Sequence, residues 1–288
     1  MTKGREPITR AVEPDRHHAT TPVTASAPTG GTWTPDEGEV EQFEREGFIV
    51  VRGLLSDEEI SRFGKAARQM VEDRRTQTRH LDGWEKVFLQ EQAVWRRDVV
   101  LRDLSLHAGI GAAAARLVRT PVRLFLDQVI CKYPGDLATL PHQDAPFLSY
   151  DDRRSVNAWI ALSQVTPAHG ALSYYRGSHG LGLLREVDLG TEDDDLLADA
   201  PQVRDRPIVE VPAQPGDVVF HHCLVVHQAG PNMTGDDRIA FSNQYMPEGA
   251  RYNGWEHEFL LDLGLALGDA LTSPAQFPAP AERPATPL

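Results

Sequence analysis

The chain has 288 residues, enough for one large domain or two small ones, and 41% of them are hydrophobic, which is ordinary for a globular core. Its formal net charge of -13 disfavours nucleic acid and anionic membrane surfaces as partners, because the summed field repels both. Cys131 and Cys223 each lie inside an apolar run, so we expect buried free thiols in a reducing, cytoplasmic setting. Neither membrane insertion nor export is expected, because no stretch approaches the ~20 apolar residues of a span and the N-terminus lacks an apolar signal segment.

Both ends of the chain are predicted to lie outside the folded domain. Residues 1–35 mix charges and small side chains without apolar periodicity, which is typical of a disordered leader. Residues 272–288 are rich in Pro and Ala and predict a loose tail. A single domain is therefore expected over residues 36–271.

A helical preface opens this predicted domain. A helix-start signature at Thr34-Pro35-Asp36-Glu37 is followed by the β-branched run Phe48-Ile49-Val50-Val51, which predicts a short strand between two glycines. Ser56 and Glu59 then have the spacing of a capping box, and apolar periodicity continues as a helix to about Arg75. Two further helices are predicted over residues 99–107 and 110–118.

Short strands with Gly and Pro punctuation make up most of the remainder. Branched and aromatic residues predict strands over 122–133, 155–163, 171–175, 208–211, 217–222 and 239–246. The neighbourhood of Leu196 to Ala200, after the acidic run 192–195, is expected to be a surface insertion. The acids lack the alternating spacing and glycine of a calcium loop. The pattern predicts a mainly β protein with flanking helices and a sandwich or barrel of jelly-roll type.

The polar run Pro141-His142-Gln143-Asp144-Ala145-Pro146 carries the strongest chemical signal. Alternate side chains of an extended backbone share a face, so His142 and Asp144 can point at the same spot. His227 lies at the end of another apolar run, from residue 218 to 226, which predicts a strand or pair of strands that could return beside the first. Two imidazoles and one carboxylate make a facial iron(II) site with open coordination positions, although the same ligands would also permit zinc.

Several segments, in this order, resemble the phytanoyl-CoA dioxygenase family of iron(II)/2-oxoglutarate oxygenases over roughly residues 40–255. They are His142-Gln143-Asp144, Ala158-Trp159-Ile160-Ala161-Leu162, Gly177-Ser178-His179, Pro215-Gly216-Asp217-Val218-Val219-Phe220, and His227 with Arg238. The resemblance implies a double-stranded β-helix, that is, a cupin-like jelly roll. It also implies that His142, Asp144 and His227 are the catalytic ligands of Fe(II).

The resemblance further implies where 2-oxoglutarate binds. Its distal carboxylate needs a cation, and the guanidinium of Arg238 can hold it with two parallel hydrogen bonds. Arg238 follows His227 as the anchoring arginine of the family follows its distal histidine, which favours His227 over His221 and His222 as the ligand. Three more residues resemble positions around the cosubstrate, although an ordinary polar role stays open for the first two: Lys86, Gln128 and Trp159.

The implied reaction consumes dioxygen and 2-oxoglutarate, releases succinate and carbon dioxide, and hydroxylates an aliphatic C–H bond of a small organic molecule in secondary metabolism. The resembling halogenases have a small residue where this chain has Asp144, so the carboxylate argues for oxygenation. Desaturation or cyclisation stays an alternative, as does a non-catalytic sensor that binds metal and 2-oxoglutarate. An acyl-CoA substrate is disfavoured, because the chain is acidic and shows no evident basic cluster for the phosphates.

Overall fold

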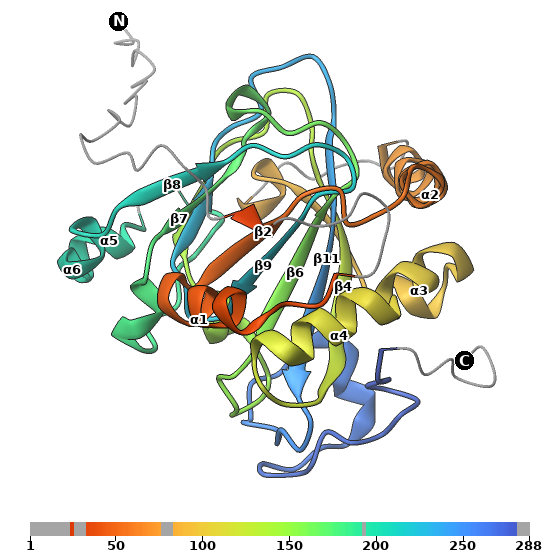
Figure 1. The fold of residues 1–288 in the computed structure, drawn as a ribbon, viewed down its shortest axis with the longest axis vertical. Helices are drawn as coiled ribbons and strands as arrows, with labels where there is room; N and C mark the ends of the chain where they lie inside the picture. The colour runs from red at the N-terminus through yellow and green to blue at the C-terminus, as the bar shows by residue number, and fades with distance from the viewer. Residues whose placement is uncertain (1–23, 26–32, 76–82, 192–193, 281–288) are drawn as a thin grey trace, which may run out of the picture.

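Two β-sheets pack face to face in the protein, which is described by a computed structural model over residues 24–25, 33–75, 83–191 and 194–280 (Figure 1). The larger sheet has the strand order β1-β2-β9-β6-β11-β4-β3, and the smaller sheet has the order β5-β10-β7-β8. The strands are β1 (Thr24–Ala25), β2 (Phe48–Val51), β3 (Leu89–Gln92), β4 (Val122–Lys132), β5 (Thr139–His142), β6 (Val156–Ala161), β7 (Leu172–Tyr175), β8 (Ile208–Val211), β9 (Val218–His222), β10 (His227–Ala229) and β11 (Arg238–Pro247).

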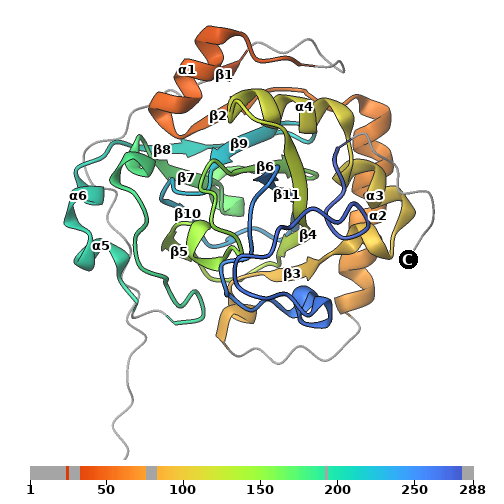
Figure 2. The ribbon, with the colours of Figure 1, turned by 90° about the horizontal axis from the view of Figure 1, so that it is seen from below.

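The chain path through these sheets is that of a double-stranded β-helix. From β4 to β11 successive strands alternate between the larger and the smaller sheet, except that β7 and β8 are consecutive in the smaller one. All strand pairs in the described ranges are antiparallel apart from β1 with β2. The predicted jelly-roll core is confirmed, and β5 and β10 of the smaller sheet lie opposite β6 and β11 of the larger sheet (Figure 2).

Helices cover the outer face of the larger sheet (Figures 1 and 2). They are α1 (Glu37–Glu46), α2 (Asp57–Arg75), α3 (Val99–Ser105) and α4 (Ala108–Leu117). Both predicted helix starts have a capping box: Asp36 accepts from the Glu39 amide, and Ser56 Oγ accepts from the Glu59 amide. Apolar side chains of these helices and of β6, β9 and β11 form one buried cluster that fixes the larger sheet from outside.

Packed structure extends past both predicted limits of the domain. Trp33 is only 4% exposed and its ring lies 5.7 Å from that of Phe220, so packing begins before residue 36. At the other end Phe277 is buried, and the Pro278 carbonyl accepts from the Leu124 amide. The tail predicted from residue 272 is therefore wrong as far as residue 280, and residues 281–288 lie outside the described ranges, as do 1–23 and 26–32 of the predicted leader.

The predicted surface insertion is a packed element. Two short helices, α5 (Leu196–Asp199) and α6 (Pro201–Arg204), follow the acidic run, of which residues 192–193 lie outside the described ranges. Leu196 is fully buried in a cluster with Tyr175 and Val226, whereas Asp195 beside it is exposed, so the apolar side chains of this segment cover the smaller sheet. Cys131 and Cys223 are buried free thiols, as predicted. In the part of the chain that the structure describes, no helix has the length and apolar character needed to cross a membrane.

Candidate active site

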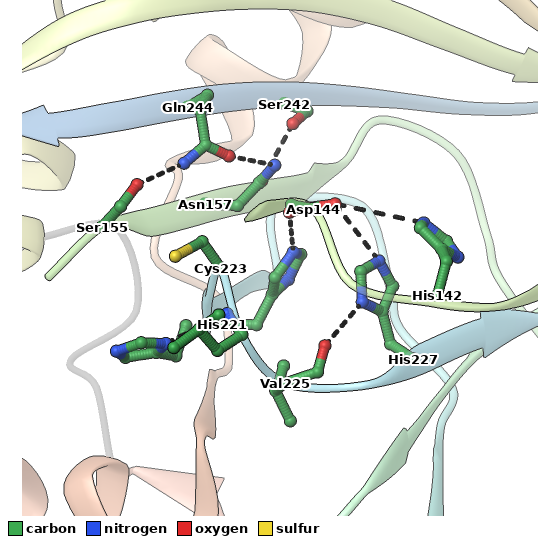
Figure 3. Close-up of polar contacts among 12 residues, drawn as sticks. His142, Asp144, Ser155, Asn157, His221, Cys223, Val225, His227, Ser242 and Gln244 are labelled. Carbon is green, nitrogen blue, oxygen red and sulfur yellow. Dashed lines mark hydrogen bonds and ion pairs between the residues drawn. The ribbon is translucent and has the colours of Figure 1, made fainter. Parts of the chain in front are cut away.

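Three side chains from two strands and a turn converge between the sheets (Figure 3). His142 ends β5, Asp144 lies in the following turn, and His227 begins β10. The Nε2 atoms of His142 and His227 lie 4.0 and 3.7 Å from Asp144 Oδ1. One donor atom from each of the three residues lies within 4.8 Å of the others, so a single ion can contact all three.

The two imidazoles are held with their Nε2 atoms facing Asp144. His142 Nδ1 lies 2.7 Å from the Leu140 carbonyl, and His227 Nδ1 lies 3.2 Å from the Val225 carbonyl. A carbonyl only accepts, so each Nδ1 carries the proton and each Nε2 keeps a free lone pair. Burial lowers the pKa of His142 and lowers the pKa of His227 to about 3, which keeps both rings neutral, the form that binds a metal.

Asp144 supplies the negative charge of this group. Burial opposes its ionisation, but the neighbouring imidazoles and a hydrogen bond from His221 hold the pKa of Asp144 below its ordinary value. His221 Nε2 lies 3.0 Å from Asp144 Oδ2. Two neutral nitrogen donors and one ionised oxygen donor form a set that suits a divalent transition metal with open positions.

A cavity of about 670 Å³ opens onto the three side chains. Aromatic walls come from Phe88, Phe147, Trp159 and Trp255. Amide and hydroxyl groups share the lining, and they come from Gln90, Gln92, Gln128, Asn157, Ser242, Gln244 and Gln228. Such a mixture of apolar walls and a few polar groups is typical of a small-molecule site.

Arg238 lines the same cavity and begins β11. It is 2% exposed, its Cζ lies 5.7 Å from the Trp159 ring centroid, and its Nε has no hydrogen-bond partner among the described residues. Burial lowers the pKa of Arg238 to about 10, so the guanidinium still carries its charge at neutral pH. Among the described residues no carboxylate lies within ion-pair distance of Arg238, and Asp136 acts on it only as a more distant charge. A buried cation of this kind calls for an anionic ligand.

The remaining predicted site residues divide into two groups. Gln128 and Trp159 line the cavity. Lys86 does not: it ends a 3-10 helix (Gly83–Lys86), is exposed, and is absent from the lining, so the structure does not bring it to the site. The cause is the local turn, which directs this side chain to solvent rather than along a strand face.

A different lysine, which the sequence reading passed over, is buried beside Arg238. Lys132 ends β4 opposite Arg238 and donates to the carbonyls of Val87 and Leu137. Burial, followed by the charge of Arg238, lowers the pKa of Lys132 to about 6. Lys132 therefore joins the segments around Val87 and Leu137 to β4, the strand that pairs with β11 at Arg238. At neutral pH the lowered pKa of Lys132 favours its uncharged form, whereas Arg238 keeps its charge.

His221 and His222, the competing ligand candidates, have separate surroundings. His221 faces the cavity, whereas His222 lies on the other side of β9, next to Phe43 and His179. The alternation of β9 gives the signal that separates them: Val219 packs between the sheets and Phe220 packs under the helices, so His221 points inwards and His222 outwards.

Comparisons with known proteins agree on one family. The family model described as phytanoyl-CoA dioxygenase (PhyH) matches residues 43–240, more than half of the chain. One similar solved structure is the crystal structure of SnoK, a non-heme alpha ketoglutarate dependent carbocyclase from nogalamycin biosynthesis. Its sequence is 30% identical, the match covers 86% of this chain and 99% of the SnoK chain, and the TM-score is 0.74. A second is the crystal structure of the epimerase SnoN in complex with Fe3+, alpha ketoglutarate and nogalamycin RO. It is 29% identical, the match covers 84% of this chain and 98% of the SnoN chain, and the TM-score is 0.70. Methylphosphonate hydroxylase of Gimesia maris is 27% identical over 214 residues, which are 71% of this chain and 78% of that protein.

Proposed function

The chain belongs to the phytanoyl-CoA dioxygenase family, and on that premise we propose that it is an oxygenase in which His142, Asp144 and His227 hold iron(II) and Arg238 holds 2-oxoglutarate. The observation that carries the proposal is the pairing, in one cavity, of the three-ligand group with a buried guanidinium that forms no ion pair among the described residues. The described residues 33–75, 83–191 and 194–280 would make up the one oxygenase domain.

The donor set fits iron(II), and Arg238 separates this function from the zinc alternative. A zinc site needs its protein ligands and a water, but it does not require a buried cation in the same cavity. A keto diacid, which chelates the metal at one end, places a second carboxylate that a guanidinium can bind through two hydrogen bonds. Arg238 is charged, buried and open to such a partner.

Each of the proposed site residues has a defined part in this chemistry. Bound iron with 2-oxoglutarate and dioxygen would supply the oxidant that attacks a C–H bond. His142 and His227 would each offer the lone pair of a neutral Nε2 atom to the metal, and the carboxylate of Asp144 would offset part of the metal charge. Trp159 covers the guanidinium of Arg238 and limits the access of water to the ion pair that it forms with the cosubstrate.

We propose hydroxylation of an aliphatic C–H bond in a mid-sized, partly polar organic molecule as the reaction. The cavity volume of about 670 Å³ and its mixed aromatic and amide lining support a substrate of that kind. A role in secondary metabolism is supported by the likeness to two proteins of nogalamycin biosynthesis, SnoK and SnoN. Incubation of the iron-loaded protein with 2-oxoglutarate, dioxygen and a panel of such molecules tests the proposal, with substrate-dependent succinate release as the readout.

Oxidative cyclisation is the second candidate, because SnoK is named a carbocyclase. The two reactions leave different products from the same starting step. Hydroxylation adds one oxygen atom to the substrate, whereas cyclisation or desaturation removes two hydrogen atoms and adds none. Mass spectrometry of the product formed in labelled dioxygen therefore distinguishes them.

A further inference from the structure

The two oxygens of the Asp144 carboxylate have different neighbours (Figure 3). Oδ1 faces the Nε2 atoms of His142 and His227, at 4.0 and 3.7 Å. Oδ2 lies 3.0 Å from Nε2 of His221, a residue of β9 that is 2% exposed. One oxygen is thus directed to the candidate metal position, and the other is occupied by a histidine from the opposite sheet.

The direction of the hydrogen bonds around His221 follows from its partners. An ionised carboxylate only accepts, so His221 Nε2 carries the proton and donates to Asp144 Oδ2. In the Nε2–H tautomer the other ring nitrogen, Nδ1, accepts, and it lies 3.1 Å from the hydroxyl of Tyr174. Burial raises the pKa of Tyr174 well above its ordinary value, which keeps this hydroxyl a donor. The chain Tyr174 O–H to His221 to Asp144 therefore runs in one direction.

The outer end of this chain is rigidly placed. Tyr174 is fully buried on β7, and its ring stacks on that of Phe48 with centroids 4.4 Å apart and an interplanar angle of 13°. Both ring nitrogens of His221 are engaged, one by Tyr174 and one by Asp144. His221 thus has no free lone pair directed at a metal, which separates its role from that of His227.

We propose that His221 is a positioning residue that makes Asp144 a one-oxygen ligand. A carboxylate can bind an ion through one oxygen or through both. With Oδ2 held by His221, only Oδ1 is available, and the positions needed by a bidentate keto acid and by dioxygen stay open. The inference rests on the proposed function, because it assigns a role toward the metal that His142, Asp144 and His227 would hold.

Three substitutions separate this role from a structural one. His221→Phe keeps a ring of similar size and removes the donor, His221→Gln places an amide N–H near the former Nε2, and Tyr174→Phe removes only the outer hydroxyl. His222→Gln is the matched control, since it alters the adjacent residue on the other side of β9. His227→Ala gives the behaviour of a lost ligand.

Anaerobic titration with Co(II), followed by its visible d–d absorption, reports both affinity and coordination. We expect His221→Phe to weaken Co(II) binding by about 10–100-fold, the range seen when a group that orients a metal ligand is removed, and to change the band pattern. His221→Gln should recover most of the affinity, Tyr174→Phe should lose less than His221→Phe, and His222→Gln should match the unaltered protein. Wild-type affinity and spectrum in a folded His221→Phe protein would overturn the inference. So would a loss in both His221 variants equal to that of His227→Ala, which would make His221 a ligand.

A second readout needs no metal. In the metal-free protein labelled with nitrogen-15 at histidine, long-range proton–nitrogen correlations should show His221 as the Nε2–H tautomer, with a proton signal that moves in Asp144→Asn. An Nδ1–H tautomer would overturn the inference even if His221→Phe failed to fold. If the unaltered protein bound neither Co(II) nor iron(II), the proposed function and the inference would both fall, whereas normal metal binding with the wrong tautomer would remove the inference alone.

Discussion

His142 and His227 are direct partners in the register of β5 and β10, and their ring centroids lie 4.3 Å apart. The pairing brings together two imidazoles that lie far apart in the sequence. Because successive side chains of a strand face opposite sides, a slip of one residue would turn one of the two rings away from the other. The register of this short strand pair is therefore what assembles the candidate metal site.

Replacement of the carboxylate ligand is the first test of that site. Asp144→Ala should remove iron binding and reduce substrate-dependent succinate release to background, because the remaining imidazoles carry no charge to offset that of the metal. Metal content after anaerobic loading and desalting provides the measurement. The exposed Asp205→Ala is the control and should behave as the unaltered protein. Full succinate production by Asp144→Ala would refute the ligand assignment.

Arg238 should govern the requirement for 2-oxoglutarate. Arg238→Ala removes two charge-assisted hydrogen bonds, together worth roughly 3–4 kcal/mol, so the concentration needed for half-maximal turnover should rise by about two to three orders of magnitude. Arg238→Lys should fall between, because it keeps a charge but not the fork. The exposed Arg154→Ala serves as the control. An unchanged requirement in Arg238→Ala would place the anion anchor elsewhere.

Lys86 and Trp159 should behave differently in the same assay. Lys86→Ala is expected to leave the 2-oxoglutarate requirement within about twofold of normal, because the side chain is exposed and lies off the cavity. Trp159→Leu should raise that requirement several-fold, since it removes the ring that lies 5.7 Å from the guanidinium of Arg238. A large effect of Lys86→Ala together with none of Trp159→Leu would reverse this assignment.

Asp127 should make the stability of the protein depend on pH. It is fully buried, accepts from Ser105 Oγ and the Trp95 amide through one oxygen, and has no partner for the other among the described residues. Burial raises the pKa of Asp127 from 3.8 to about 6. Because the folded state holds this proton more tightly than the unfolded state, stability falls as pH rises through that interval, by up to about 3 kcal/mol.

Thermal unfolding of Asp127→Asn tests this sign. The variant cannot ionise at residue 127, so its midpoint relative to that of the unaltered protein should increase between pH 4 and pH 7. Asp205→Asn, at an exposed position, should shift little at any pH. Parallel curves for Asp127→Asn and the unaltered protein would show that Asp127 is ionised in the folded state with an ordinary pKa.

The sequence was a good guide to the long elements and a poor one to the short strands of the site. Periodicity and capping patterns correctly predicted α2, β4 and β11, because each buries a continuous apolar face. At the site the sequence indicated only an extended backbone at His142 and a strand or pair of strands in the run that leads to His227. The bounds of β5 (Thr139–His142) and β10 (His227–Ala229) could not be predicted, since these strands are short and the chemistry replaces apolar residues by polar ones. Only the pairing of the sheets makes them strands.

The contacts of individual side chains were also only partly predictable from the sequence. The proximity of His142 and Asp144 could be anticipated from their spacing, although Asp144 lies in a turn and not on an extended strand. The contact of His221 with Asp144 could not, because it depends on how two sheets face each other. Lys86 was misplaced because a local sequence likeness does not reveal the 3-10 turn that directs it outwards. The direction of such side chains depends on packing between segments that lie far apart in the sequence.

Anaerobic addition of 2-oxoglutarate to the iron(II)-loaded protein tests the central claim most directly, because chelation of iron(II) by the keto acid produces a weak visible charge-transfer band. We predict a band that saturates with 2-oxoglutarate in the unaltered protein, needs far more 2-oxoglutarate in Arg238→Ala, and is absent in Asp144→Ala. A folded, unaltered protein that shows no such band at any 2-oxoglutarate concentration would contradict the account.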